Sequence, residues 1–101
     1  MTIWSLYLLR TGQNTLYTGI TTNVDQRFGE HQQSKKGAKY LRAKGPLQLV
    51  YQVALGNRSL ASKAEYRLKR LTKLKKEKIV IDSLDRNALL ALLKLEESGN
   101  I

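Results

Sequence analysis

The chemically most informative residues lie near the N-terminus of the sequence. Tyr7 and Tyr17 fall in two segments rich in β-forming residues, and Gly19 leaves space beside the second tyrosine. Arg27 and His31 are one helical turn apart, so they are neighbours on the surface of a predicted helix. We interpret these residues together as one wall of an active site.

Each of these side chains also has an ordinary structural explanation. A tyrosine in a strand is usually a packing residue. Arg27 can be a solvated charge, and His31 can be a boundary residue beside the apolar stripe of Val24 and Phe28. Taken singly, these explanations are the stronger ones, and only the combination of residue types and spacing favours a site.

A carboxylate that could complete the site comes from a later predicted helix. Glu65 falls just off that helix's apolar stripe, which consists of Leu60, Ala61, Ala64, Leu68 and Leu71. Glu65 either pairs with Lys69 four residues later or binds a metal ion. The chain has no cysteine and one histidine, so a bound metal must use oxygen ligands, which favours a hard cation such as Mg²⁺ or Mn²⁺.

The hydrophobic pattern of the first third predicts a hairpin followed by a helix. Residues 3–10 and 15–20 are predicted strands joined by a turn. The helix has Asn23 as its N-cap and ends near Gln33. Gly29 inside this helix costs about 1 kcal/mol relative to alanine, which indicates close packing at that point.

The remainder of the sequence predicts one more strand and further helices. Residues 47–55 form a central or core-facing strand, and a helix capped by Asn57 or Ser59 follows. The stretch 71–81 either continues that helix or starts a second one. A last, leucine-rich helix at about 85–97 packs against the back of the sheet or forms a surface for a protein partner.

The length of 101 residues predicts a single domain, 1–101, with a core at about 3–80. No apolar run approaches membrane-spanning length, and the N-terminus lacks a signal-peptide pattern. We therefore expect a cytoplasmic protein that makes no membrane contact.

Positive charge is concentrated after residue 26. Eighteen basic and eight acidic residues give a net charge of +10. Residues 27–44 carry six basic side chains against one acidic, and residues 57–78 carry nine against two. The alternatives are an evenly solvated surface and a basic face for a polyanion, and the bias favours nucleic acid. The predicted contacts are Lys35, Lys36, Lys39, Arg42, Lys44, Arg67 and Arg70.

The order of the candidate residues resembles that of the GIY-YIG nuclease family. The two family motifs correspond to Ser5-Leu6-Tyr7 and Tyr17-Thr18-Gly19, of which the tyrosines and the last glycine are kept. Arg27 follows ten residues after Tyr17, and Glu65 lies in a later helix. The sequence is most similar to the small stand-alone bacterial YhbQ-like group.

This resemblance implies an α/β (α+β) fold with a small three-stranded antiparallel sheet flanked by helices. It implies a metal-dependent endonuclease in which Glu65 holds one divalent cation and Arg27 holds the scissile phosphate. Tyr17 corresponds to a proposed general base, supported by Tyr7. His31 occupies a position that is histidine or tyrosine in many members, and it is a competing base because an imidazole titrates near neutrality.

Three functional hypotheses follow from these observations. The first is an endonuclease that hydrolyses phosphodiester bonds, with DNA favoured over RNA and a role in repair or recombination. The second is a nucleic-acid-binding module with a degenerate nuclease site. The third is an interaction protein that uses its last helix.

Many family members have an asparagine about a dozen residues after the glutamate, where this chain has Glu77.

Overall fold

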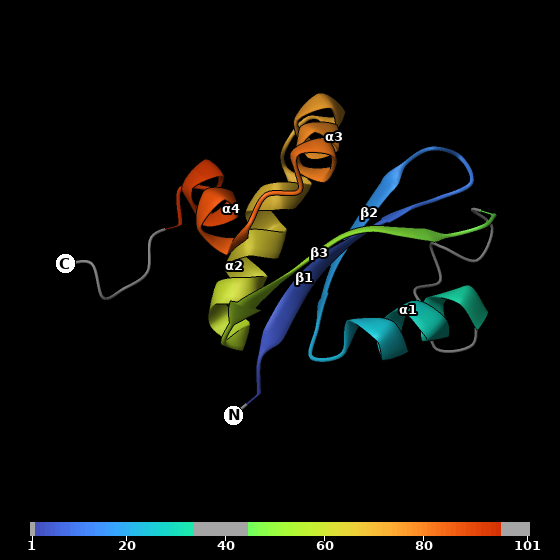
Figure 1. Ribbon diagram of the computed structural model, residues 1–101, viewed down its shortest axis with the longest axis horizontal. Helices are drawn as coiled ribbons and strands as arrows, with labels where there is room; N and C mark the ends of the chain where they lie inside the picture. Colours follow the sequence, from blue (N-terminus) through green and yellow to red (C-terminus); the bar gives the residue numbers. More distant parts are fainter. Residues whose placement is uncertain (1, 34–44, 96–101) are drawn as a thin grey trace.

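The computed structural model describes residues 2–33 and 45–95, and within them the chain forms one three-stranded sheet and four helices (Figure 1). All pairings are antiparallel, in the order β2-β1-β3. In chain order the elements are β1 (Trp4–Arg10), β2 (Leu16–Thr21), α1 (Val24–Gln33), β3 (Gln48–Gly56), α2 (Arg58–Lys69), α3 (Lys73–Asp82) and α4 (Arg86–Leu92). The predicted α+β architecture is confirmed. The central strand is β1, whereas β3 lies at an edge and faces the core.

The central strand β1 sends side chains to both faces of the sheet. Leu6 and Leu8 point to one face and Tyr7 and Leu9 to the other, and all four are buried. The first pair packs against the helices of the second half of the chain, and the second pair packs against α1. In Figure 1, α1 accordingly lies below the sheet, with α3 and α4 above it.

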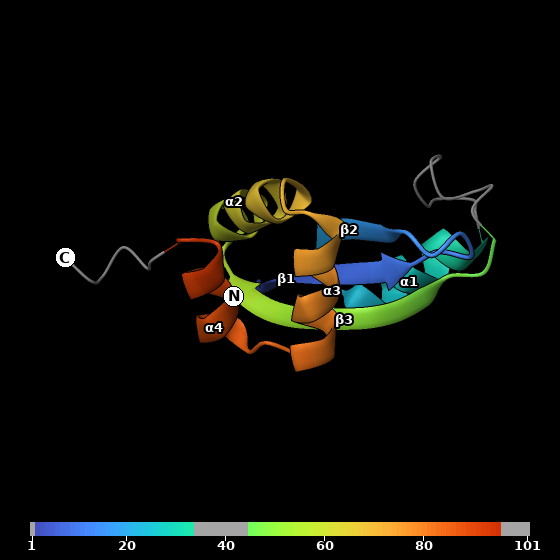
Figure 2. The same cartoon turned by 90° about the horizontal axis from the view of Figure 1, so that it is seen from above.

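The two cores differ in size. The larger one joins the sheet to the second-half helices through Ala61, Ala64, Leu68, Ile79, Leu89, Leu90, Leu93 and Leu95. The smaller one contains Tyr7, Leu9 and Val24, with Tyr17 and Phe28 packed against it. Helix α2 runs on the β2 side of the sheet, and α3 and α4 lie toward β3 (Figure 2). The hairpin and α1 are thus held against a scaffold built by the remainder of the chain.

Side-chain caps begin each helix where the sequence places a polar residue. Asn23 Oδ1 accepts a hydrogen bond from the Gln26 amide at 3.0 Å, and Asn57 Oδ1 accepts one from the Leu60 amide at 2.8 Å. Thr72 and Asp85 cap the last two helices in the same way. The predicted cap at Asn23 is confirmed, Asn57 rather than Ser59 caps α2, and a second helix starts after Thr72.

The last helix is shorter than the sequence predicted. It ends at Leu92, and Lys94 follows with a φ of +59°. The Leu95 amide bonds the Leu90 carbonyl at 2.8 Å, and the Lys94 amide bonds the Ala91 carbonyl at 3.1 Å. This is a Schellman closure, which turns the chain so that Leu95 packs in the core. The burial of one more leucine therefore decides where the helix stops.

The expectation of close packing at Gly29 is wrong. A Cβ atom built there meets no atom within 4 Å, apart from its own helix and chain neighbours. The glycine therefore gains nothing from tertiary contacts that would offset its low helix propensity.

An ion pair joins the central strand to α3. Arg10 Nη1 and Nη2 each donate to one carboxylate oxygen of Glu77 at 2.7 Å, and Lys73 Nζ adds a third bond at 3.0 Å. The hydrogen bond from Arg10 is the main reason that the pKa of Glu77 falls from 4.5 to about 2. The residue where the family often has asparagine thus anchors α3 to the sheet.

We predict that Glu77→Gln lowers the free energy of unfolding at neutral pH and has little effect on it at acidic pH. Because the folded-state pKa is depressed, Glu77 stabilises the native state fully above pH 4.5, and this contribution is lost as the pH falls toward 2. Urea unfolding at pH 7 and at pH 2 measures the effect. The variant should be less stable than wild type at pH 7 and nearly equal to it at pH 2. An equal deficit at both pH values would contradict the assignment.

Candidate active site

Tyr7 reaches the candidate site by crossing over the edge strand. It pairs with Gly19 of β2, and a Cβ atom on Gly19 would lie only 2.5 Å from Tyr7 Cζ. The phenol ring therefore occupies the space that a side chain at Gly19 would fill, and its hydroxyl points toward the β2 side of the sheet. The sequence predicted that the space at Gly19 lies beside Tyr17, but in the structure the Tyr7 ring fills this space.

A buried hydrogen bond connects this phenol to α1. The Tyr7 hydroxyl lies 2.9 Å from His31 Nε2, and the two side chains are almost fully inaccessible. The Tyr17 ring meets the same imidazole edge-on, with ring centroids 5.4 Å apart. His31 was expected at the boundary of the helix, but it lies in the core because it is wedged against both tyrosines.

Arg27 lies one turn before His31 and is partly exposed. Its Nη1 donates to Glu30 Oε1 at 2.9 Å, an ion pair between residues three apart on α1. The positive charge of Arg27 also acts on both groups: it partly opposes the rise that burial causes in the pKa of Tyr7, and it adds to the lowering that burial causes in the pKa of His31. The guanidinium is therefore close to the buried pair while remaining open to an anion from solvent.

Burial keeps both members of the pair uncharged at neutral pH. It is the main cause that raises the pKa of Tyr7 to about 12, with the Tyr17 phenol and the Glu65 carboxylate adding to the rise. Burial is also the main cause that lowers the pKa of His31, and Arg27 contributes. Tyr7 thus retains its proton, and His31 is a neutral imidazole.

Glu65 comes to the same place from α2. Its side chain is three-quarters buried, and after burial and Tyr17 its negative charge is a further influence that raises the pKa of Tyr7. One carboxylate oxygen lies 3.4 Å from Lys69 Nζ. Glu65 therefore forms the predicted ion pair with Lys69 and also lies within electrostatic reach of Tyr7, whereas its role as a metal ligand stays a prediction.

The candidate site offers few side chains that could bind a metal ion. The described residues contain no cluster of three or more histidines, aspartates or glutamates that could hold a metal. One carboxylate fits Mg²⁺, which usually keeps several waters and binds through one or two carboxylates plus substrate phosphates. Glu65 is the residue of this site that suits such a cation.

The predicted nucleic-acid contacts fall into two groups. Lys35, Lys36, Lys39, Arg42 and Lys44 lie outside the described residues. In α2, Arg67 Nη1 donates to the carbonyls of Leu93 at 2.9 Å and Lys94 at 2.8 Å. Arg67 therefore caps the end of α4, and its predicted contact with nucleic acid stays a prediction. Arg70 stacks on the exposed Tyr66 ring at 5.5 Å and remains accessible.

Two charged residues of the site did not enter the predicted set. Glu30 and Lys69 each pair with a candidate residue on their own helix. Their spacing of three and four residues from Arg27 and Glu65 was the available signal. The sequence could therefore have indicated both ion pairs.

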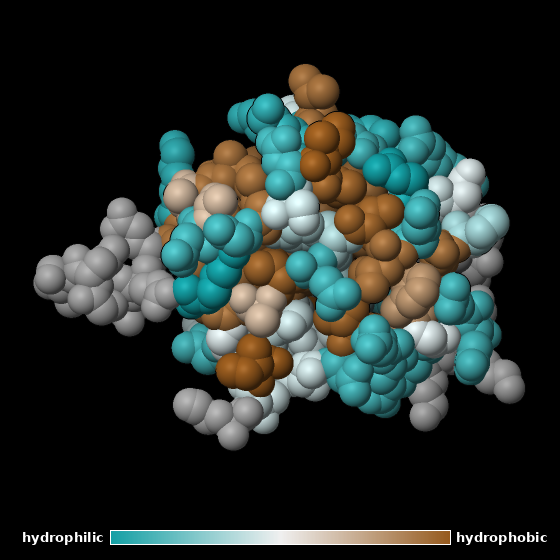
Figure 3. Space-filling model, in the orientation of Figure 1, coloured by the Kyte–Doolittle hydropathy of each residue, from teal (hydrophilic) through white to brown (hydrophobic). Residues whose placement is uncertain are grey.

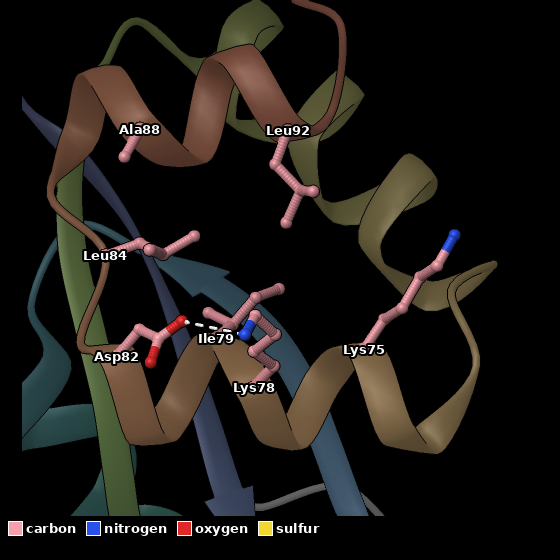
Figure 4. Close-up of a pocket in the computed structure, with 7 residues that line it drawn as sticks. All are labelled: Lys75, Lys78, Ile79, Asp82, Leu84, Ala88 and Leu92. Atoms are coloured by element: carbon pink, nitrogen blue, oxygen red, sulfur yellow. Dashed lines mark ion pairs between the residues drawn. The ribbon is translucent and has the colours of Figure 1, made fainter.

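A separate groove lies between α3 and α4 and holds none of the candidate residues. Its volume is about 360 Å³, and it is lined by Lys75, Lys78, Ile79, Asp82, Leu84, Ala88 and Leu92 (Figure 4). Hydrophobic side chains also gather on the outer surface over these helices (Figure 3). On α3, Leu74 and Ile81 are about four-fifths exposed. The groove is an apolar surface on the opposite side of the sheet from α1.

Comparison with known families defines the class of this protein. A family model described as the GIY-YIG catalytic domain matches residues 3–78. The chain therefore belongs to the GIY-YIG family, and within it to the UPF0213 group.

Relatives in this group have nearly the same length. UPF0213 protein YhbQ of Escherichia coli K12 is 54% identical over 97 residues, which cover 96% of each chain. A UPF0213 protein of Citrobacter koseri is 55% identical over 94 residues, or 93% of each chain.

Two solution NMR structures share the fold. The UPF0213 protein BH0048 of Bacillus halodurans has 35% identity and a TM-score of 0.53, with 93% of this chain and 99% of that chain covered. EF2693 of E. faecalis has 32% identity and a TM-score of 0.58, with 81% and 86% covered.

We predict that Gly19→Ala displaces the Tyr7 ring. A Cβ cannot share the position of the phenol, so the ring must leave or the strands must separate, at a cost of about 1–3 kcal/mol typical of overpacking. Urea unfolding measures the loss of stability, and His31 ring signals in NMR report the broken contact. Gly29→Ala is the matched control because that position is open. Unchanged stability and unchanged His31 signals in Gly19→Ala would contradict the geometry.

Proposed function

We propose that this protein is a metal-dependent endonuclease that hydrolyses phosphodiester bonds in nucleic acid, with DNA favoured over RNA. The observation that carries the proposal is the environment of the Tyr7 phenol. It bonds His31, and the charges of Arg27 and Glu65 act on it from two separate helices. A cation and an anion held beside buried phenols suit a phosphate and its counter-ion.

The charge of the chain supports a polyanionic substrate. The net charge is +10, and α2 carries four cations beyond its first residue: Lys63, Arg67, Lys69 and Arg70 at its cap. Such a bias raises the local concentration of nucleic acid and makes binding sensitive to salt. None of the described helices is long and apolar enough to cross a membrane.

Arg27 binds the scissile phosphate in this proposal. Its guanidinium is planar and always charged, so it offers paired donors to phosphate oxygens and stabilises the charge that develops on them. Glu65 holds the divalent cation, together with water and substrate oxygens. When bound, this cation supplies Lewis-acid stabilisation of the same charge.

The three aromatic residues have different roles. In the hydrolysis, the oxygen of water bonds to phosphorus, the bond to the leaving oxygen breaks, and that oxygen takes a proton from solvent. Tyr17, which is half-buried, accepts the proton of the attacking water. His31 has its Nε2 against the Tyr7 hydroxyl and is closed to solvent, so it positions Tyr7.

We expect Arg27→Ala and Glu65→Gln each to lower cleavage at least a hundredfold, since each removes one charge aimed at the reacting phosphate. Supercoiled plasmid, branched DNA and single-stranded RNA, each with Mg²⁺, are the substrates. The matched controls are Arg58→Ala, which removes one positive charge outside the candidate site, and Asp82→Asn, which removes one negative charge there.

The same assay separates the proposal from its alternative. Salt-sensitive binding by wild-type protein without cleavage of any substrate would favour the nucleic-acid-binding module. Equal cleavage by wild type and both variants would remove Arg27 and Glu65 from the site.

We expect Tyr17→Phe to lower kcat at least a hundredfold, since it removes the proton acceptor. His31→Gln should lower it less than tenfold and keep the acidic limb of the pH–rate profile, because His31 does not meet the water. Circular dichroism checks that both variants are folded. If the acidic limb vanishes in His31→Gln while Tyr17→Phe stays near wild type, histidine is the base.

A protein partner at the last helix stays a prediction. Helix α4 buries Leu89 and Leu90 in the core of this chain, and its C-cap residue Leu93 is buried as well. Leu92 is partly exposed and lines the groove against α3, so this groove is where a partner of the last helix would make contact.

A further inference from the structure

The cation partner of Glu65 occupies the space beside the candidate metal ligand. Lys69 Nζ lies 3.4 Å from Glu65 Oε2, within ion-pair distance. Lys69 is about half exposed, whereas Glu65 is mostly buried. A divalent cation bound by Glu65 would therefore compete with Lys69 for the same carboxylate.

We propose that Lys69 is a placeholder cation, which neutralises Glu65 in the metal-free site and is displaced when a divalent cation binds. This inference rests on the proposed function, because it takes Glu65 as the metal ligand. It assigns Lys69 a positioning role: it keeps the carboxylate paired before loading, and it sets how tightly the metal is held.

The energies of the two contacts favour such an exchange. An ion pair between residues four apart on a helix, with one partner half exposed to solvent, contributes little to stability, so releasing Lys69 costs little. A dication beside the same carboxylate gains roughly twice the Coulomb attraction at equal distance. The displaced ammonium remains near the loaded site because it is the last residue of α2.

The position of Lys69 at the end of the helix gives it a second anchor. Cations are stabilised near a helix C-terminus by the exposed carbonyl groups. Once released from Glu65, the side chain of Lys69 therefore stays at the last turn of α2, where its charge is still favoured.

Binding of Mn²⁺ alone tests the inference without any substrate. The loss of the free Mn²⁺ signal in electron paramagnetic resonance gives the dissociation constant of purified protein. Lys69→Met should bind Mn²⁺ about fivefold more tightly than wild type, since it removes one like charge a few ångströms from the dication. Lys69→Arg should stay near the wild-type value because it keeps the charge.

Lys63→Met is the matched control, because it loses the same charge from the same helix. Lys63 lies two residues before Glu65, about 200° around the helix, so its removal should change Mn²⁺ affinity less than twofold. Equal tightening by Lys63→Met and Lys69→Met would overturn the inference, since it would reflect net charge alone. Unchanged or weaker binding by Lys69→Met would overturn it as well.

Glu65→Gln separates failure of the inference from failure of the proposed function. If this variant loses Mn²⁺ binding, Glu65 is the ligand and the Lys69 variants decide the inference. If wild type and Glu65→Gln bind Mn²⁺ equally, the metal site itself is wrong and the inference is overturned with it. Thermal unfolding of each variant shows whether it is folded, so that a change in Mn²⁺ affinity is not read from an unfolded protein.

Discussion

The contact between the Tyr7 hydroxyl and His31 Nε2 is the interaction on which the site depends. Tyr7 lies on the central strand and His31 on α1, and both are closed to solvent. A buried hydroxyl or imidazole without a partner costs about 1–3 kcal/mol, so each group requires the other. Gly19 makes the contact feasible because it leaves room for the ring. Arg27 shares α1 with His31, and the Tyr17 ring packs edge-on against the same imidazole.

Most of the fold could be predicted from local signals. Alternating apolar residues located the strands, and polar residues such as Asn23 and Asp85 located the helix starts, because these features act within a few residues. The position of β3 at an edge and the end of α4 at Leu92 could not be predicted. Both depend on which side chains the remaining chain can bury, as the packing of Leu95 illustrates.

The sequence indicated candidate residues for the site, but it did not indicate how their side chains contact one another. Residue order and the family resemblance indicated Tyr7, Tyr17, Arg27 and Glu65. That Gly19 makes room for Tyr7, and that His31 is buried, depends on strand register and on the angle of α1. Arg67 shows the opposite case: it matched a basic surface by composition, yet its donors meet the carbonyls at the end of α4.

The small core beneath α1 links folding to chemistry. Only Val24 and His31 of this helix are buried, and His31 is itself a site residue. The groups that keep α1 on the sheet are therefore largely the groups proposed to assemble around the phosphate. Selection cannot adjust the local stability of this helix without also adjusting its chemistry. The larger core on the opposite face contributes to the site only through α2, which it holds in place and which carries Glu65.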